Sequence, residues 1–434
     1  MKTCSIREYE SFTRDKECGN GYKRLDAKTF DALKQFILES KGDGETEGLE
    51  LMFYSSRRGI GEVITAKNYV GVIAMQAGTV IEILPKTANG DEAESVKLLL
   101  AMLRTIKDLP FKTFNMANLD AGRLRVFEVF ISMFVSEVKR LVQKGLKSDY
   151  VFHQNNERFL KGKLVFQNHL KHNLAHKERF FVEYHQYDRN RPENRVIKTA
   201  LQYLFRFSNS AKNKKDIHTL LNVFDEVQVS VNVDADLKDC SNGRDMLAYE
   251  QVLRWCEVFL RGNSFTNAKG NNRARALLFP MERLFESYVA EHLKKAISCK
   301  NYDVRMQDHM HCLFHKTFAM RPDIVVEHKQ ENEVIVLDTK WKLLDPGITN
   351  YGISQGDMYQ MYAYGKKYKS EKVVLLYPFN EMVANLKKSI NFSSSENDTV
   401  SVHVRFLNLA KKNFVEDVVA EFFGEKGVRY SITD

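Results

Sequence analysis

The sequence predicts a mixed α/β (α+β) protein in which three regions follow one another along 434 residues. Short runs of β-branched residues before residue 86 indicate a small β-rich region, 1–115. Apolar stripes with a helical period dominate the next part and indicate a helical middle region, 116–270. Strand and helix patterns then alternate, so we expect a C-terminal domain, 271–434, with a mixed sheet flanked by helices.

The N-terminal region is expected to hold one helix and a small antiparallel sheet. Asp26 is a candidate N-cap for a helix over 27–39. Strands are expected at 49–54, 62–65, 70–75 and 79–84. The turn between the first two strands carries Arg57 and Arg58, which makes it a cationic surface loop.

The middle region is expected to be mainly helical, apart from one stretch rich in cations and aromatic rings. Helices are predicted at 94–107, 121–144, 193–207, 216–227 and 245–261. In the stretch 144–181 we expect the rings to pack in a core and the lysines to face solvent. The alternative is a DNA track or a partner surface. The small, polar segment 261–272 is the expected boundary before the C-terminal domain.

A β-hairpin in the C-terminal domain is predicted to gather three charged side chains. Its arms, 321–326 and 334–340, are short and rich in β-branched residues. Because side chains alternate along a strand, Asp338 and Lys340 emerge on the same side, about 7 Å apart. Folding the hairpin back can bring Asp323 to the same edge of the sheet.

This combination suits metal-assisted hydrolysis of a phosphodiester. Mg²⁺ prefers oxygen ligands and keeps several waters, so Asp323, Asp338 and the backbone carbonyl of Thr339 suffice to bind it. The Lys340 ammonium can orient the attacking water and stabilise the transition state. The simpler interpretation is a pair of solvated carboxylates at strand ends beside a lysine.

Two helices are expected to flank the hairpin. On the first, over 280–298, Glu282 and Glu286 lie one turn apart, and either can lean toward the hairpin or face solvent. On the second, over 355–365, Gln360 and Tyr364 share one face, although a core tyrosine with an incidental glutamine is the alternative. Strands at 372–377 and 400–407, a loop at 393–398 and a helix at 413–423 are expected to complete the domain.

A zinc site is the main competing interpretation within this domain. The candidate ligands are His309, His311, Cys312 and His315. Closed zinc sites usually draw ligand pairs from two separated segments, and no second pair is evident. We therefore expect these residues to form strands that lead into the hairpin.

The hairpin motif, Pro-Asp followed by Asp-x-Lys, resembles the pattern of the PD-(D/E)xK nuclease superfamily. A longer set of motifs is similar to McrC, the endonuclease subunit of the modification-dependent McrBC restriction system. These motifs are 67–73 with 83–86, 194–201, 284–286, 321–323, 337–342 and 357–364.

The resemblance implies a restriction-endonuclease-like sheet and a set of functional residues. It makes Asp323, Asp338, Lys340 and Glu286 the catalytic residues, with Thr339 and the three carboxylates as metal ligands. It also implies DNA contacts by Lys342, Gln360 and Tyr364. The N-terminal part of McrC engages a GTPase ring, for which Arg57 and Arg58 are the first candidates.

Composition agrees with this expectation. The net charge of +9 and the pI near 9.0 favour a polyanionic partner. Six cysteines without regular spacing, no signal peptide and no long apolar run indicate a soluble, cytoplasmic protein without a membrane partner. No glycine-rich phosphate loop occurs, so we expect this chain to bind no nucleotide itself.

The sequence therefore predicts a Mg²⁺-dependent endonuclease subunit, with Mn²⁺ as a possible substitute. Its expected partners are an McrB-like AAA+ GTPase ring, whose hydrolysis it stimulates, and double-stranded DNA that carries modified cytosine. Two alternatives remain open: a stand-alone RecB-like repair nuclease, and a non-cleaving adaptor that activates a partner NTPase.

Overall fold

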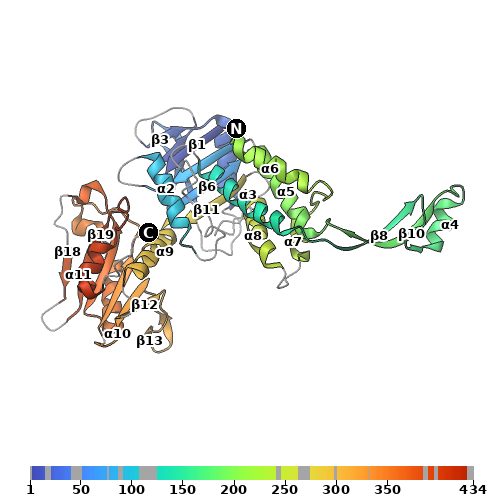
Figure 1. The fold of residues 1–434 in the computed structure, drawn as a ribbon. Helices are drawn as coiled ribbons and strands as arrows, with labels where there is room; N and C mark the ends of the chain where they lie inside the picture. The colour runs from blue at the N-terminus through green and yellow to red at the C-terminus, as the bar shows by residue number, and fades with distance from the viewer. Residues whose placement is uncertain are drawn as a thin grey trace.

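The fold was analysed in a computed structural model (Figure 1). The structure describes residues 2–14, 21–40, 51–75, 78–86, 91–106, 125–240, 246–261, 274–297, 301–331, 333–384, 390–394 and 399–427. Both predicted domain boundaries, at 115 and 270, lie outside these residues, as does part of the predicted loop at 393–398. The division of the chain at those positions therefore stays a prediction.

The N-terminal region contains two four-stranded sheets with α1 (Ala27–Ser40) against their shared core. One has the order β3-β2-β5-β4, from β2 (Ser11–Thr13), β3 (Tyr22–Arg24), β4 (Met52–Arg57) and β5 (Gly61–Ala66). The other has the order β1-β7-β6-β11, from β1 (Lys2–Arg7), β6 (Tyr69–Met75), β7 (Thr79–Leu84) and β11 (Ala274–Pro280). The predicted cap of α1 is confirmed, because the Thr29 amide donates to Asp26 Oδ1 at 3.0 Å.

This region is less uniform than the sequence predicted. The four expected strands are present, but they are divided between two sheets, and β1 pairs with β7 in a parallel ladder. Strand β1 was not predicted, because only Ile6 of its six residues is buried and its pattern is polar. Strand β11 lies about 200 residues further along the sequence and pairs with β6 over seven residues, Ala274 to Pro280.

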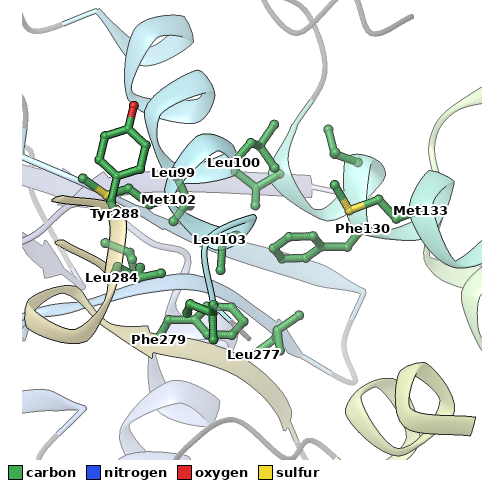
Figure 2. Packing of buried hydrophobic residues seen from close by; sticks show 14 of the residues in the cluster. Leu99, Leu100, Met102, Leu103, Phe130, Met133, Leu277, Phe279, Leu284 and Tyr288 are labelled. Atoms are coloured by element: carbon green, nitrogen blue, oxygen red, sulfur yellow. The ribbon is translucent and has the colours of Figure 1, made fainter. Parts of the chain in front are cut away.

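Six helices build the middle of the molecule and the bridge to the C-terminal sheet. They are α2 (Glu92–Leu103), α3 (Val126–Lys144), α5 (Pro192–Phe207), α6 (Ala211–Val223), α7 (Val233–Asp239) and α8 (Leu247–Arg261). Figure 2 shows how α2 and α3 pack with β11 and with α9 (Met281–Ala296) in one apolar core. Phe130 of α3, Leu103 of α2 and Phe279 of β11 are almost completely buried there.

The predicted helical stretch is interrupted by a projecting β arm. Strands β8 (Asp149–Glu157) and β10 (Phe180–Asp188) form its antiparallel shaft, with β9 (Lys163–Leu164) and α4 (Phe166–Asn173) at the end (Figure 1). The expectation that its rings lie in a core was wrong for most of them. Tyr150, Phe152, Phe159 and Phe166 are each more than half exposed, because the arm extends away from the other elements.

The C-terminal domain is a mixed six-stranded sheet with helices on both faces, as predicted. Its order is β12-β15-β16-β17-β19-β18, from β12 (Tyr302–Met306), β15 (Ile324–His328), β16 (Val334–Thr339), β17 (Lys372–Pro378), β18 (Ile390–Ser393) and β19 (Ser401–Leu407). One face packs on α9 and α11 (Glu416–Gly427), and the other on α10 (Gln355–Tyr368). The hairpin β13 (Cys312–Phe314) and β14 (Thr317–Ala319) precedes β15.

Candidate active site

Asp323 and Asp338 lie opposite each other at one end of the predicted hairpin. The ladder between β15 and β16 pairs Ile324 with Leu337, so the next position along the same register pairs Asp323 with Asp338. Both continue the sheet face that carries Val325 and Val336, which packs on the α10 side. The sequence prediction that the hairpin brings these two carboxylates together is therefore met by the geometry.

Asp323 is fixed in place by its neighbour across the hairpin. Its Oδ2 accepts hydrogen bonds from the Thr339 amide at 2.7 Å and from the Thr339 hydroxyl at 2.6 Å. Both bonds fall on the same oxygen, which leaves Oδ1 available to a ligand. Thr339 thus lies within the cluster, although its side chain orients Asp323 and only its carbonyl remains as a candidate ligand.

Asp338 is connected to Lys340 and, through it, to α10. The Lys340 ammonium lies 2.6 Å from Asp338 Oδ2, an ion pair whose angles do not give that buried oxygen a hydrogen bond. Lys340 also donates to Gln360 Oε1 at 3.2 Å, and Gln360 Nε2 donates to the Tyr364 hydroxyl at 2.8 Å. Tyr364 is only 3% exposed, so this chain of contacts lies behind Lys340.

Glu286 on α9 reaches the same end of the sheet. Its Oε1 accepts a hydrogen bond from Gln307 Nε2 at 2.8 Å, and the Gln307 amide in turn donates to the Asp323 carbonyl at 2.8 Å. Gln307 has a φ of 49°, a backbone conformation that costs free energy in a residue other than glycine. The other candidate, Glu282, accepts instead from Asn68 Nδ2 at 3.3 Å.

Glu286, Asp323 and Asp338 lie close enough that the charge of one changes the pKa of the others. Burial and the charge of Asp323 raise the pKa of both Glu286 and Asp338 to about 7. Burial also raises the pKa of Asp323. Burial lowers the pKa of Lys340, but Asp338 and Asp323 outweigh that effect, so its pKa is raised and the ammonium stays charged. Such perturbed groups cluster at functional sites.

Glu286, Asp323 and Lys340 open into a cleft of about 750 Å³, whereas the buried Asp338 is not among its lining residues. Glu286, Asp323, Thr339, Lys340 and Lys342 line it. The Lys342 ammonium donates to the Gly352 carbonyl at 2.5 Å, which places this predicted DNA contact at the wall of the cleft. Gln360 and Tyr364 do not line it.

The oxygen atoms of Asp323 and Asp338 are ligands of the kind that a divalent cation needs. In the described parts of the chain, no group of three or more His, Cys, Asp or Glu side chains is arranged to hold a metal ion. Mg²⁺ commonly uses only one or two carboxylates and completes its shell with water. Asp323 and Asp338 supply two; Asp323 Oδ2 is taken by Thr339, and the buried Oδ2 of Asp338 faces the Lys340 ammonium at 2.6 Å without a hydrogen bond. The residues present thus fit a hydrated Mg²⁺ better than a closed cage.

The zinc alternative finds no support among the described residues. His311 packs edge-on against Tyr368, with ring centroids 4.4 Å apart, and Cys312 begins the short hairpin β13–β14. The interpretation of this segment as strands leading into the catalytic hairpin is confirmed.

Arg57 and Arg58 lie far from this cluster in the fold. They are exposed at the tip of the β4–β5 hairpin, where the Arg57 guanidinium donates to the Tyr22 hydroxyl. The predicted partner residues and the predicted catalytic residues thus lie on different sheets of the fold.

Sequence reasoning missed the N-terminal residues at the cleft. Tyr9 and Lys86 line it, and the Glu8 carboxylate accepts hydrogen bonds from Trp341 Nε1 at 3.0 and 3.1 Å and from the Lys86 amide at 3.1 Å. Glu8 and Trp341 are 333 positions apart, so no local pattern could pair them. The one available signal was the tryptophan that directly follows the Asp-x-Lys motif.

The family of the chain follows from comparison with known proteins. The family model described as "McrBC 5-methylcytosine restriction system component" matches residues 64–378, most of the chain and all of the cluster described above. The chain belongs to this McrBC family. None of the curated proteins matches it.

Comparison with solved structures shows a shared fold in one case. A chain of the "Refined half-complex from tetradecameric assembly of Thermococcus gammatolerans McrB AAA+ hexamers with bound McrC" aligns with a TM-score of 0.64 and 19% identity, over 94% of both chains. A chain of the "Cryo-EM structure of the Thermococcus gammatolerans McrBC complex" aligns with a TM-score of 0.47 and 21% identity, over 68% of this McrBC-family chain and 88% of the other. No described helix is long and apolar enough to cross a membrane.

Proposed function

We propose that this McrBC component is the nuclease subunit of its restriction system, a Mg²⁺-dependent DNA endonuclease of the PD-(D/E)xK type. The observation that carries the proposal is the convergence of Asp323, Asp338 and Lys340 at one end of the six-stranded sheet, beside an open cleft. A solvated pair of surface carboxylates would not be buried to 1% exposure, as Asp338 is.

Asp323 and Asp338 would hold the cation, with the Thr339 carbonyl as a further ligand, while Glu286, which accepts a hydrogen bond from Gln307, would stand beside them. When bound, Mg²⁺ neutralises phosphate charge and favours ionisation of a water. Thr339 holds the Asp323 carboxylate in one orientation through two hydrogen bonds. Burial and, after it, the charge of Asp323 raise the pKa values of Asp338 and Glu286, and a cation bound beside them would favour their ionised forms.

Lys340 would act on the attacking water and the developing phosphate charge. Its ammonium is directed by the Asp338 carboxylate and by Gln360 Oε1, and Tyr364 fixes the amide of Gln360 in turn. This support favours an orienting role for Gln360 and Tyr364 over the direct DNA contact that the motif resemblance implied. Lys342 remains a candidate for binding the substrate phosphate, because it lines the cleft.

We further infer that the chain works with an AAA+ GTPase ring and stimulates its hydrolysis. The solved structure with the TM-score of 0.64 contains McrB AAA+ hexamers with bound McrC, and its match covers 94% of this chain. Two surfaces suit a protein partner. One is the hairpin tip with Arg57 and Arg58, and the other is the β arm with its exposed Tyr150 and Phe152.

The test is DNA cleavage with Mg²⁺ by the wild type, Asp338→Asn and the surface control Asp417→Asn. Each is assayed alone and with an McrB-like GTPase ring plus GTP, on cytosine-modified and unmodified DNA. We expect cutting only of modified DNA with partner and GTP. Asp338→Asn should reduce it about 100-fold or more, because a ligand and the Lys340 counter-charge change together, whereas Asp417→Asn should cut normally.

The other outcomes identify the alternatives. Cutting by the chain alone, independent of GTP and modification, would indicate a stand-alone repair nuclease. Faster GTP turnover with wild type and Asp338→Asn alike, without any cutting, would indicate an adaptor and would overturn the nuclease proposal.

A further inference from the structure

A second cleft adjoins the one that holds the carboxylates. It measures about 580 Å³, and the two clefts share Lys86, Trp341 and Pro378 in their linings. Lys86 is the only charged residue among the three. The clefts are thus two parts of one surface channel that passes between the N-terminal sheet and the C-terminal domain.

The two parts differ in charge. The first contains four carboxylates, from Glu282, Glu286, Asp323 and Asp357, and three lysines. In the second, Lys86, Lys97 and Lys412 face a single carboxylate, that of Glu94. Its three lysines come from the segment after β7, from α2 and from the loop before α11. Distant parts of the chain therefore contribute cations to one place.

These lysines also differ in how they are engaged. In the first cleft, Lys340 is paired with Asp338, and Lys342 donates to the Gly352 carbonyl. The ammonium groups of Lys86, Lys97 and Lys412 form no hydrogen bond or ion pair with any residue that the structure describes. That of Lys86 lies 5.8 Å from the centre of the Tyr9 ring. Unpaired ammonium groups are available to bind an anion at little desolvation cost.

We propose that the second cleft binds the DNA backbone next to the cut, with Lys86, Lys97 and Lys412 each contacting a phosphate. The inference rests on the proposed nuclease function and adds a binding site for the same substrate. Without a bound cation, the first cleft presents four carboxylates and three lysines to the DNA, so the lysines beside it supply the positive charge that attracts the duplex. Contacts of this kind position the duplex without reading its sequence.

Tyr9 supports this assignment. Its φ of 66° is unfavourable for an aromatic residue, and its side chain is 55% exposed at the cleft beside Lys86. The Tyr9 amide donates to the Ala66 carbonyl at 3.0 Å, which fixes this strained turn. An exposed ring beside a free lysine can pack on a sugar or base while the lysine binds the phosphate.

The experiment compares three full-length proteins: the wild type, a triple variant with Lys86→Gln, Lys97→Gln and Lys412→Gln, and a matched control. The control carries Lys28→Gln, Lys212→Gln and Lys294→Gln, which remove the same charge from exposed positions outside both clefts. Binding of a fluorescent duplex is measured by anisotropy at several salt concentrations, without divalent cations. A triple arginine variant of the three cleft lysines tests for rescue, and thermal melting verifies folding.

We expect the cleft variant to lose about 10- to 100-fold in affinity for the duplex. The slope of log affinity against log salt concentration should become shallower by about 2 to 3, since each lost phosphate contact contributes roughly 0.9 to it. Arginine should preserve binding, and the control should match the wild type. Equal affinity and slope for the cleft variant and the control would overturn the inference. If the wild type cuts modified DNA with the partner ring and GTP, such a result leaves the proposed function intact, whereas a wild type that neither binds DNA nor cuts it under those conditions overturns both.

Discussion

At the scale of single residues, the side chains of the candidate site are held in place by one another. Thr339 orients Asp323, and Asp338 directs the ammonium of Lys340. Gln360 holds that ammonium from the opposite side at 3.2 Å. Asp323 and Lys340 are thus each positioned by hydrogen bonds or ion pairs from neighbouring side chains.

Gln360→Leu tests the role of this support. The substitution removes the acceptor of Lys340 while keeping a side chain of similar volume. If Gln360 orients Lys340, kcat should fall about 10-fold, and the affinity for DNA should stay constant. The measurement is single-turnover cleavage together with duplex anisotropy. A weakened affinity with unchanged kcat would instead support the DNA contact that the sequence motif implied.

Local pattern predicted the residues of the hairpin and missed those that meet it from elsewhere. Asp323, Asp338 and Lys340 belong to two adjacent strands, so strand alternation sufficed to bring them together. Glu8 and Lys86 reach the cleft through the packing of a different sheet, which no periodicity records. The role of Tyr364 was also beyond the pattern, because burial of its ring depends on the whole α10 interface.

At the scale of elements, β11 is the least expected feature of the fold. It lies in the sequence next to α9, which supplies Glu286, but it pairs with β6 in the N-terminal sheet. The close approach of the two strands depends on Gly71, whose φ is 134°. A Cβ at this position would lie 2.0 Å from the Leu277 carbonyl oxygen, closer than any side chain tolerates.

Gly71→Ala should therefore destabilise the protein strongly. We expect a loss of at least about 2 kcal/mol in the free energy of unfolding, from backbone strain together with displacement of β11. Gly59→Ala is the control, because Gly59 also has a positive φ, of 82°, but no atom within 4 Å of the added Cβ. Its cost should be about 1 kcal/mol. Denaturant titration of both variants measures the difference, and equal losses would contradict the steric argument.

Element types were more predictable than their assembly. Asp26 marked the start of α1, and apolar stripes located α3, α5 and α8 to within a few residues. The β arm was not predicted, because its alternation of aromatic rings and cations is also typical of a buried strand with a solvated edge. The exposed arm differs from a buried strand in that it projects away from the other elements, which leaves Phe159 60% exposed.

At the scale of the whole molecule, Glu8 connects the N-terminal sheet with the strand that carries the catalytic motif. It is 1% exposed and accepts hydrogen bonds from Trp341 and Lys86. Burial raises its pKa to about 7, above the ordinary value of 4.5 that it has in the unfolded chain. The folded protein therefore favours the protonated form of Glu8.

The sign of the resulting pH dependence follows from linkage. Because the folded-state pKa of this acid is raised, its contribution to the free energy of unfolding decreases as pH rises from about 4.5 to 7 and is constant above. Glu8→Gln, which is neutral throughout, should match the wild type near pH 4.5 and exceed it by about 3 kcal/mol at pH 8. Denaturation followed by tryptophan fluorescence at both pH values tests this. A constant difference between the two proteins across that range would rule out titration of Glu8 as the cause.

The pairing of β11 with β6 has a consequence for dividing the molecule. Dividing the chain between α8 and β11 would leave the edge of β6 unpaired on the first fragment. The second fragment would begin with an unpaired apolar strand that contains Leu277 and Phe279. Open edges and loose strands self-associate, so each fragment expressed alone should be prone to aggregate. Expressed together, the two pieces carry the matching strands of one ladder and can reassemble, which makes the segment before β11 a suitable position at which to split the protein into two recombinable parts.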